Sequence, residues 1–213
     1  MTADREGVVI REIVTASDTA WEGWKEVYLA SFPEQERMSE AFFLRFFARK
    51  EIGEATQSHM LVMTPEAAAG QVLGLGFYEV SPVLATGFLW YLATPPVHRG
   101  RGLGARLYAE LVGRLRAEKA RLLLFEVEIP EVAAQESAEA AEFARRRIEW
   151  YRRLGAQVLC GVEYFQTVDG PAAPVPMHVM AHRFEPMTAE DVYELAAQFF
   201  GTAIQQRQSP TLK

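Results

Sequence analysis

The segment from Arg99 to Gly104 constrains the fold of this chain more than any other part of its sequence. It reads Arg-Gly-Arg-Gly-Leu-Gly, so that glycine occupies every second position. An apolar segment typical of a β-strand, 87–93, precedes it, and apolar residues at helical spacing follow it over 103–115. A strand, a glycine turn and a helix start together create an anion site, because glycines let a ligand approach backbone N–H groups at the positive end of the helix. The sequence therefore predicts a phosphate-binding loop, to which Arg99 and Arg101 add positive charge.

The same glycines can be compared with two other phosphate-binding motifs. A nucleoside-triphosphate P-loop is excluded, because no Gly-Lys-Ser/Thr follows. The dinucleotide fingerprint G-x-G-x-x-A is matched by Gly100–Ala105, with Glu126 about twenty residues further on, where a ribose-binding acid belongs. However, several predicted strands come first, Pro95 to Arg99 separate the glycines from the preceding strand, and no doubly wound sheet is completed after Ile129. A dinucleotide-dependent oxidoreductase is therefore the less favoured interpretation.

Hydrophobic periodicity elsewhere predicts a mixed α/β domain over residues 1–186, followed by a C-terminal helix and tail over 187–213. Strands are expected at 8–14, 59–63, 71–80, 87–93, 121–129, 157–166 and 176–184. Helices are expected after Asp18, from about Ser39, over 103–115, up to Leu154 and after Thr188. The strands between 59 and 93 are joined by short turns and indicate an antiparallel meander. The C-terminal helix is expected to pack on the same domain or on a partner.

The composition limits the kinds of binding partner and the cellular compartment that this chain can have. The net charge of −6 and the pI of about 5.4 disfavour a general nucleic-acid binder. A single cysteine, Cys160, excludes an internal disulfide and suits a reducing compartment. Residues 1–6 lack a signal-peptide pattern, and the longest weakly charged stretch is interrupted too often to span a membrane. The four histidines have no metal-ligand spacing. We therefore expect a cytoplasmic protein without a metal, and with neither a nucleic acid nor a membrane as partner.

Taken together, these features resemble the GNAT superfamily of acyl-CoA-dependent N-acyltransferases. Its signature, Gln/Arg-x-x-Gly-x-Gly/Ala, corresponds to Arg99–Gly104, and its tyrosine shortly before a helix-ending glycine corresponds to Tyr151 and Gly155. The expected order of elements over 8–184 is also similar. The resemblance implies a mixed, mostly antiparallel central sheet flanked by helices, to which this chain adds its C-terminal helix. It also implies an N-acetyltransferase that moves an acetyl group from acetyl-CoA directly to an amine in a ternary complex.

The resemblance further implies roles for the residues around the cofactor. The pyrophosphate would be bound by the backbone N–H groups of Arg99, Gly100, Arg101, Gly102, Leu103 and Gly104. The pantetheine arm would pair with Leu92, Ala93 and Thr94, because the prolines that follow have no N–H. Tyr151 would be the general acid that protonates the departing thiolate. The family's frequent asparagine about seven residues before the tyrosine is missing near Ala144, and Ala156 replaces a common aromatic residue.

Carboxylates on an otherwise apolar strand are the candidates for deprotonating or binding the acceptor. Glu126 and Glu128 alternate with apolar residues and are expected on one face of the strand, and Glu79 is a third candidate. The acceptor pocket is expected to be lined by these glutamates, Phe32 to Arg37, the phenylalanine-rich second helix and Tyr78. The sequence leaves open which carboxylate acts and whether the acceptor is a small molecule or a peptide. It also leaves open whether the chain forms a homodimer, and whether it is instead a non-catalytic acyl-CoA-binding or regulatory module.

Overall fold

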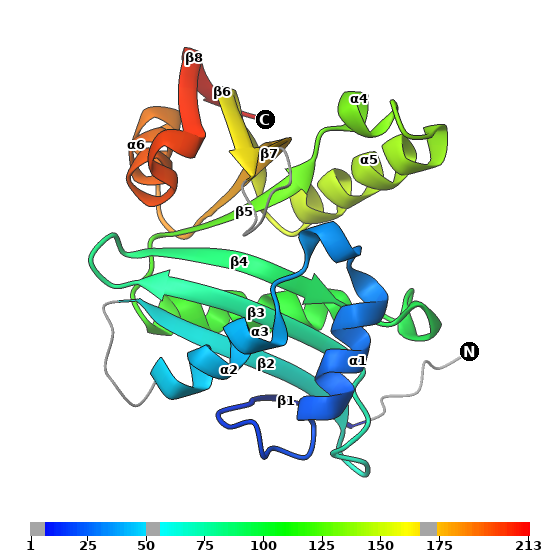
Figure 1. Cartoon of the computed structure of the whole chain (residues 1–213). Coiled ribbons are helices and arrows are strands. Elements are labelled where there is room, and N and C mark those ends of the chain that lie inside the picture. The colour runs from blue at the N-terminus through cyan, green and yellow to red at the C-terminus, as the bar shows by residue number, and fades with distance from the viewer. Residues whose placement is uncertain (1–6, 50–55, 167–173) are drawn as a thin grey trace. The chain divides into compact units, whose positions relative to one another are not determined.

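Residues 7–49, 56–166 and 174–213 are described by the computed structural model of the chain (Figure 1). Residues 1–6, on which the prediction of a missing signal peptide rests, lie outside this part. The chain divides into two units, each assembled from two stretches of sequence. The first unit comprises Met1–Glu79 and Leu89–Arg114, and the second comprises Val80–Phe88 and Leu115–Lys213.

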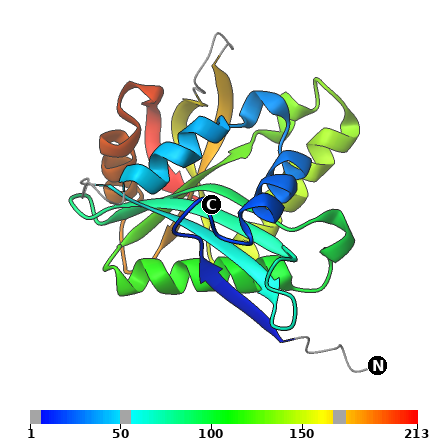
Figure 2. The same ribbon diagram turned by 60° about the horizontal axis from the view of Figure 1, so that its bottom comes forward.

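The strands of the first unit form the predicted meander with one further strand at its edge. They are β1 (Val8–Glu12), β2 (Gln57–Pro65), β3 (Gly74–Ser81) and β4 (Thr86–Ala93), and they neighbour one another in that order. The end of β3 and the start of β4, within Val80–Phe88, belong to the second unit. The edge strand β1 is antiparallel to β2, with Ile10 opposite Met63. Two helices, α1 (Trp21–Ser31) and α2 (Glu40–Arg49), cover one face of these strands, and α3 (Leu103–Ala117) covers the other (Figure 2).

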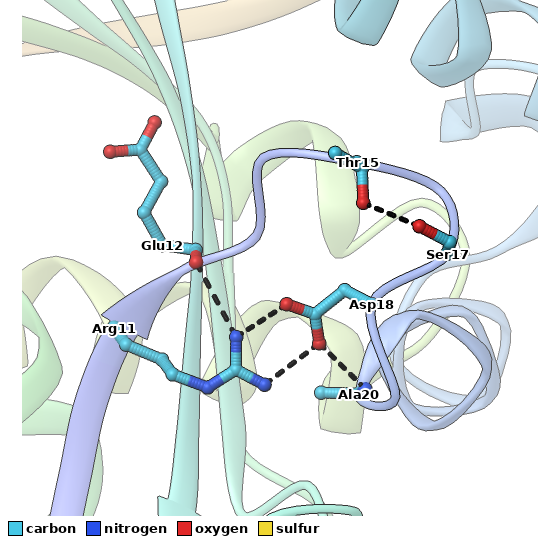
Figure 3. A network of polar contacts seen from close by, with 6 residues as sticks. All are labelled: Arg11, Glu12, Thr15, Ser17, Asp18 and Ala20. Atoms are coloured by element: carbon cyan, nitrogen blue, oxygen red, sulfur yellow. Dashed lines mark hydrogen bonds and ion pairs between the residues drawn. The ribbon is translucent and has the colours of Figure 1, made fainter.

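Asp18 organises the turn that leads from β1 into α1. One of its carboxylate oxygens accepts a hydrogen bond from the Ala20 N–H at 2.8 Å, just before the helix begins. The guanidinium of Arg11 donates to both oxygens, at 2.6 and 2.7 Å (Figure 3). These donors favour the charged form, so the pKa of Asp18 is lowered, chiefly by its hydrogen bond with Arg11. Asp18 is therefore not the helix cap that the sequence predicted: Ala20 occupies the N-cap position without a side-chain cap hydrogen bond, and Asp18 stabilises the turn before it.

Aromatic side chains at helical spacing form the core of the first unit. Trp21, Trp24 and Tyr28 are buried on α1, and Phe43 packs against Trp24 with ring centroids 5.1 Å apart. The indole N–H of Trp24 donates to the Leu61 carbonyl at 3.1 Å, so its polar group is satisfied inside the core. On α2, Phe43 and Phe46 are buried, whereas Phe42 and Phe47 are only partly buried. The phenylalanine-rich helix is therefore mainly a core element of its unit.

The second unit is built on four antiparallel strands in the order β5-β7-β6-β8. They are β5 (Leu122–Glu128), β6 (Gln157–Gln166), β7 (Val175–Arg183) and β8 (Ile204–Leu212). The helices are α4 (Pro130–Ala133), α5 (Ala138–Arg153) and α6 (Ala189–Phe200), with α5 and α6 on either side of the strands (Figure 1). Short 3-10 turns lie at Glu34–Glu36 and Pro96–His98 in the first unit and at Gly201–Ala203 in the second.

The C-terminal segment differs from the expected helix and tail. The helix is present, and Thr188 and Asp191 form the predicted capping box, with Asp191 N–H to Thr188 Oγ1 at 3.1 Å and Thr188 N–H to Asp191 Oδ2 at 2.7 Å. It packs on its own unit, where Phe199 and Phe200 contact Phe88. The expected tail, however, is the strand β8, which pairs with β6.

The predicted fold class is confirmed: the chain is a mixed α/β protein with mostly antiparallel strands, flanking helices and a C-terminal helix. Among the described residues, none of the helices has the length and apolar character needed to cross a membrane.

Candidate active site

The glycine loop, 99–104, lies in the first unit; it follows a 3-10 turn, and its last two residues are the first two of α3. Gly100 and Gly102 both have φ of +77°, a left-handed conformation that side chains with a Cβ rarely adopt. A Cβ built on either residue would meet no heavy atom within 4 Å. The backbone here is thus open to the approach of a ligand. Gly104 is a helical residue, so its backbone conformation does not by itself require glycine.

The backbone donors of this loop are directed by the start of α3. The first hydrogen bond of the helix runs from Arg106 N–H to Gly102 carbonyl at 3.1 Å. The N–H groups of Leu103 and Gly104 therefore have no carbonyl of their own helix to bind, and they carry its partial positive charge. Arg99 differs, because its N–H already donates to the Pro96 carbonyl at 3.2 Å. The donors suited to an anion thus begin after Arg99, and with the open backbone they fit a pyrophosphate.

The predicted pantetheine-binding residues stand at the end of β4, in the same unit. Leu92 and Ala93 are the last two residues of the strand, and Thr94 follows them; all three are half-buried. The guanidinium Nε of Arg99 donates to the Thr94 carbonyl at 3.2 Å, which ties the loop back to the strand end. Sequence reasoning missed this link, since it treated Arg99 only as a source of positive charge.

Glu79 is held by its neighbours in the first unit. Ser58 Oγ donates to one carboxylate oxygen at 2.8 Å, and the indole N–H of Trp90 donates to the other at 3.0 Å. Both oxygens of this carboxylate thus already accept hydrogen bonds, one from β2 and one from β4. The third candidate for the base is thereby weakened.

Tyr151 lies on α5 in the second unit and is buried. Its ring packs against Phe125, with centroids 4.4 Å apart, and against Trp150 at 4.7 Å. Burial raises the pKa of Tyr151 to about 12, while the positive charge of Arg147 lowers it and the negative charge of Glu128 raises it. The phenol therefore keeps its proton at neutral pH, as a general acid must.

The two glutamates of β5 have different partners, although they are two residues apart on one strand. Arg147 of α5 donates from Nη1 to Glu128 Oε1 at 2.7 Å. Glu128 Oε2 is buried, and no described residue offers it a hydrogen bond. Glu126 instead accepts a hydrogen bond on each oxygen, from the hydroxyl of Tyr164 and from the side-chain amide of Gln166.

Tyr164 and Gln166 are site residues that sequence reasoning did not find. Both come from β6, which is separated from β5 by β7. Burial, followed by the charge of Glu126 and the hydrogen bond to it, raises the pKa of Tyr164. The hydroxyl therefore remains a donor to the carboxylate. In the order β5-β7-β6, the side chains of Tyr164 and Gln166 on β6 reach Glu126 on β5. The sequence does not indicate this strand order.

The predicted site residues thus fall into two groups, one in each unit. The loop 99–104, the strand end 92–94 and Glu79 belong to the first unit. Tyr151, Glu126 and Glu128 belong to the second unit, where Arg147 connects Tyr151 and Glu128 electrostatically. A mixed, mostly antiparallel fold, an open glycine loop before a helix and a buried tyrosine agree with the predicted class, a transferase that uses a phosphate-bearing acyl donor.

Comparison with known proteins identifies the family. A sequence model of the Acetyltransferase (GNAT) family matches residues 21–155. The chain belongs to this family, and is an acyl-CoA-dependent acetyltransferase by class. This confirms the resemblance and replaces the dinucleotide-dependent interpretation. None of the curated proteins with which the sequence was compared matches it.

Solved structures support the same fold. A GNAT-family protein from Bacteroides thetaiotaomicron has a TM-score of 0.69 and 24% identity, with 91% of this chain and 99% of that chain covered. The structure of yncA from Salmonella typhimurium, which contains its cofactor acetyl-CoA, has a TM-score of 0.56 and 17% identity, with 85% and 96% covered. The ribosomal-protein-alanine N-acetyltransferase of Brucella melitensis has a TM-score of 0.55 and 21% identity, with 83% and 99% covered.

Proposed function

We propose that this protein transfers an acetyl group from acetyl-CoA directly to the amino group of an acceptor while both are bound. The observation that carries the proposal is the glycine loop of a GNAT-family chain: Gly100 and Gly102 are left-handed, open to a ligand and next to a helix N-terminus. When bound, acetyl-CoA supplies a thioester, an acyl group already activated for attack by an amine.

The first unit binds the donor. The backbone N–H groups of Gly100 to Gly104 bind the pyrophosphate, assisted by the charge of Arg101. The backbone of Leu92, Ala93 and Thr94 pairs with the pantetheine arm in the manner of an added strand. A backbone N–H at this strand end, such as that of Leu92, polarises the thioester carbonyl as negative charge develops on its oxygen.

The second unit moves the protons. The amine nitrogen forms a bond to the carbonyl carbon, the carbon–sulfur bond breaks, one proton leaves the nitrogen and one proton reaches the sulfur. Tyr151 donates the proton to the sulfur, consistent with a pKa of about 12 that keeps its phenol protonated. A carboxylate of β5 accepts the proton from the nitrogen.

Glu128 is the better of the two β5 carboxylates for this task. Its Oε2 has no hydrogen bond from any described residue and can accept an N–H of the acceptor. Both oxygens of Glu126 already accept hydrogen bonds from β6. We assign Glu126 to orienting the acceptor. An acceptor that carries its positive charge on an amino group suits both carboxylates, and the single cysteine suits action in the cytoplasm.

The test is acetyl-CoA-dependent thiol release, measured with the purified protein against a panel of small amines and peptide N-termini. Thiol release above the rate of acetyl-CoA hydrolysis, together with an acetylated acceptor of the expected mass, supports the proposal. If CoA binds but no amine or peptide stimulates thiol release, the chain is a non-catalytic acyl-CoA-binding module instead.

A further inference from the structure

Three consecutive arginines on α5 have different surroundings. Arg145 and Arg146 both pair with Glu142 on the exposed face of the helix, and 56% and 77% of their side-chain surfaces are exposed. Arg147 has 32% of its side chain exposed and donates to Glu128 of β5 at 2.7 Å. Within this charged run, therefore, Arg147 is the residue directed to the candidate site.

The position of Arg147 on its helix is set from both sides. Its guanidinium lies over the ring of Phe143, one turn earlier, at 4.9 Å from the ring centroid. Tyr151 follows one turn later, and side chains four residues apart lie next to each other on a helix. The contact with this ring restricts the orientations of the guanidinium that holds Glu128.

The two carboxylate oxygens of Glu128 differ: Oε1 accepts a hydrogen bond from Arg147, and the buried Oε2 accepts none from any described residue. A buried carboxylate oxygen without a hydrogen bond is unfavourable, so such an oxygen in a folded protein calls for a partner. An ionised carboxylate can only accept, and its partner must therefore carry N–H or O–H. In the proposed reaction the amino group of the acceptor carries N–H and can supply this donor.

We propose that Arg147 is a positioning residue for acetyl transfer: it holds Glu128 Oε1 so that Oε2 receives the acceptor amino group, and it places a positive charge beside Tyr151. The inference rests on the proposed function. It assigns the two oxygens of Glu128 separate roles, one structural and one toward the acceptor. It also places a positive charge next to a carboxylate and a phenol that lie close together. The charge of Glu128 raises the pKa of Tyr151, and the charge of Arg147 lowers it.

The first experiment compares Arg147→Gln, Arg147→Lys and the matched control Arg146→Gln in steady-state thiol release. We expect Arg147→Gln to lower kcat/KM for the acceptor about tenfold or more, because Glu128 loses a charged partner. The KM for acetyl-CoA should stay within about twofold. Lysine retains the charge and should recover part of the loss, whereas Arg146→Gln should behave as wild type.

The second experiment separates this role from a merely structural one by double mutation. Arg147 acts through its hydrogen bond to Glu128, so the effect of losing it should depend on that carboxylate. Adding Arg147→Gln to Glu128→Gln should therefore lower kcat/KM for the acceptor by less than twofold.

The outcomes that overturn the inference differ from failure of the proposed function. If wild type is active and Arg147→Gln raises the KM for acetyl-CoA instead, Arg147 contacts the donor and the inference is wrong. It is equally wrong if the effects of Arg147→Gln and Glu128→Gln on kcat/KM are additive in the double variant. A wild-type protein without acetyltransferase activity would overturn the proposed function itself.

Discussion

Individual side chains in the second unit show how burial sets the protonation state of a site. Tyr151 and His182 are both buried, and in both cases burial favours the neutral form. For Tyr151 this keeps a proton available for donation. For His182 it removes a charge from the packing around the end of α5, where the imidazole lies beside Gly155.

Replacing Tyr151 by phenylalanine removes the proposed acid while leaving the packing against Phe125 largely in place. We expect kcat to fall by roughly 10²–10⁴-fold, the usual contribution of general acid catalysis. CoA affinity, measured by calorimetric titration, should change by less than about twofold. Tyr193→Phe on α6 is the matched control and should retain wild-type turnover. Unchanged kcat in Tyr151→Phe would remove the phenol from the mechanism.

The stability of the protein should depend on pH through His182. Burial, followed by the charge of Arg116, lowers its pKa to about 4, from 6.5 for an unperturbed histidine. Between these values the unfolded chain binds more protons than the folded one, so the contribution is intact above about pH 6.5 and is lost as pH falls toward 4. Urea unfolding of wild type between pH 7 and 4.5 should show this loss, roughly 2–3 kcal/mol in all. His182→Gln should have a flatter profile, and equal slopes in the two proteins would contradict the assignment.

At the scale of elements, the sequence predicted those with a strong internal signal. The strand at 157–166 has the bounds of β6, and the helix that Gly155 was expected to stop ends at Arg153. The stretch 132–142, read as a loop or helix start, contains the end of α4 and the start of α5, which Ser137 caps by accepting from Ala140 N–H at 3.0 Å. Elements with alternating or helical periodicity could thus be located, within a few residues, without the structure.

β8 could not be predicted in this way. Its residues run Ile-Gln-Gln-Arg-Gln-Ser-Pro-Thr-Leu, and only Ile204 is buried. A strand at the edge of a sheet needs no apolar alternation, and proline is tolerated there, so the usual signal is absent. The candidate site could likewise be predicted only in part. The loop 99–104 and Tyr151 belong to local sequence motifs and could be located. The contacts of Glu126 with Tyr164 and of Glu128 with Arg147 join residues far apart in the sequence, so they depend on strand pairing and helix packing.

The junction between α5 and β6 offers a test of one glycine. Gly155 has φ of +100°, and a Cβ there would lie 3.2 Å from His182 Nε2. Gly155→Ala should therefore lower the free energy of unfolding by about 1–3 kcal/mol through backbone strain and the close contact. A Cβ at Gly113 on α3 would meet no heavy atom within 4 Å, so Gly113→Ala should raise the free energy of unfolding by about 0.5–1 kcal/mol. Denaturant titration of both variants measures the difference, and equal midpoints would refute the explanation.

At the scale of the whole molecule, ligand specificity can be examined without knowing the acceptor. The protein carries a net charge of −6, so binding of an anionic cofactor must come from local donors and not from overall attraction. Free CoA at about 100 times its dissociation constant should stabilise the fold by roughly 2.7 kcal/mol and raise Tm accordingly. NAD at the same concentration should leave Tm unchanged. A shift with NAD and none with CoA would contradict the assignment of the glycine loop to CoA.

The pairing of β8 with β6 also bears on how the chain is made. β6 lies between β7 and β8, and residue 212, opposite Leu159, is about 46 residues beyond the end of β6. At roughly 5–20 residues per second, translation needs about 2–9 seconds to cover this stretch. During that interval one side of β6 has unpaired backbone groups that can bind another strand. Slow translation or premature termination over residues 167–212 should therefore favour aggregation of nascent chains. The residues that protect β6 thus lie outside the matched family region, 21–155.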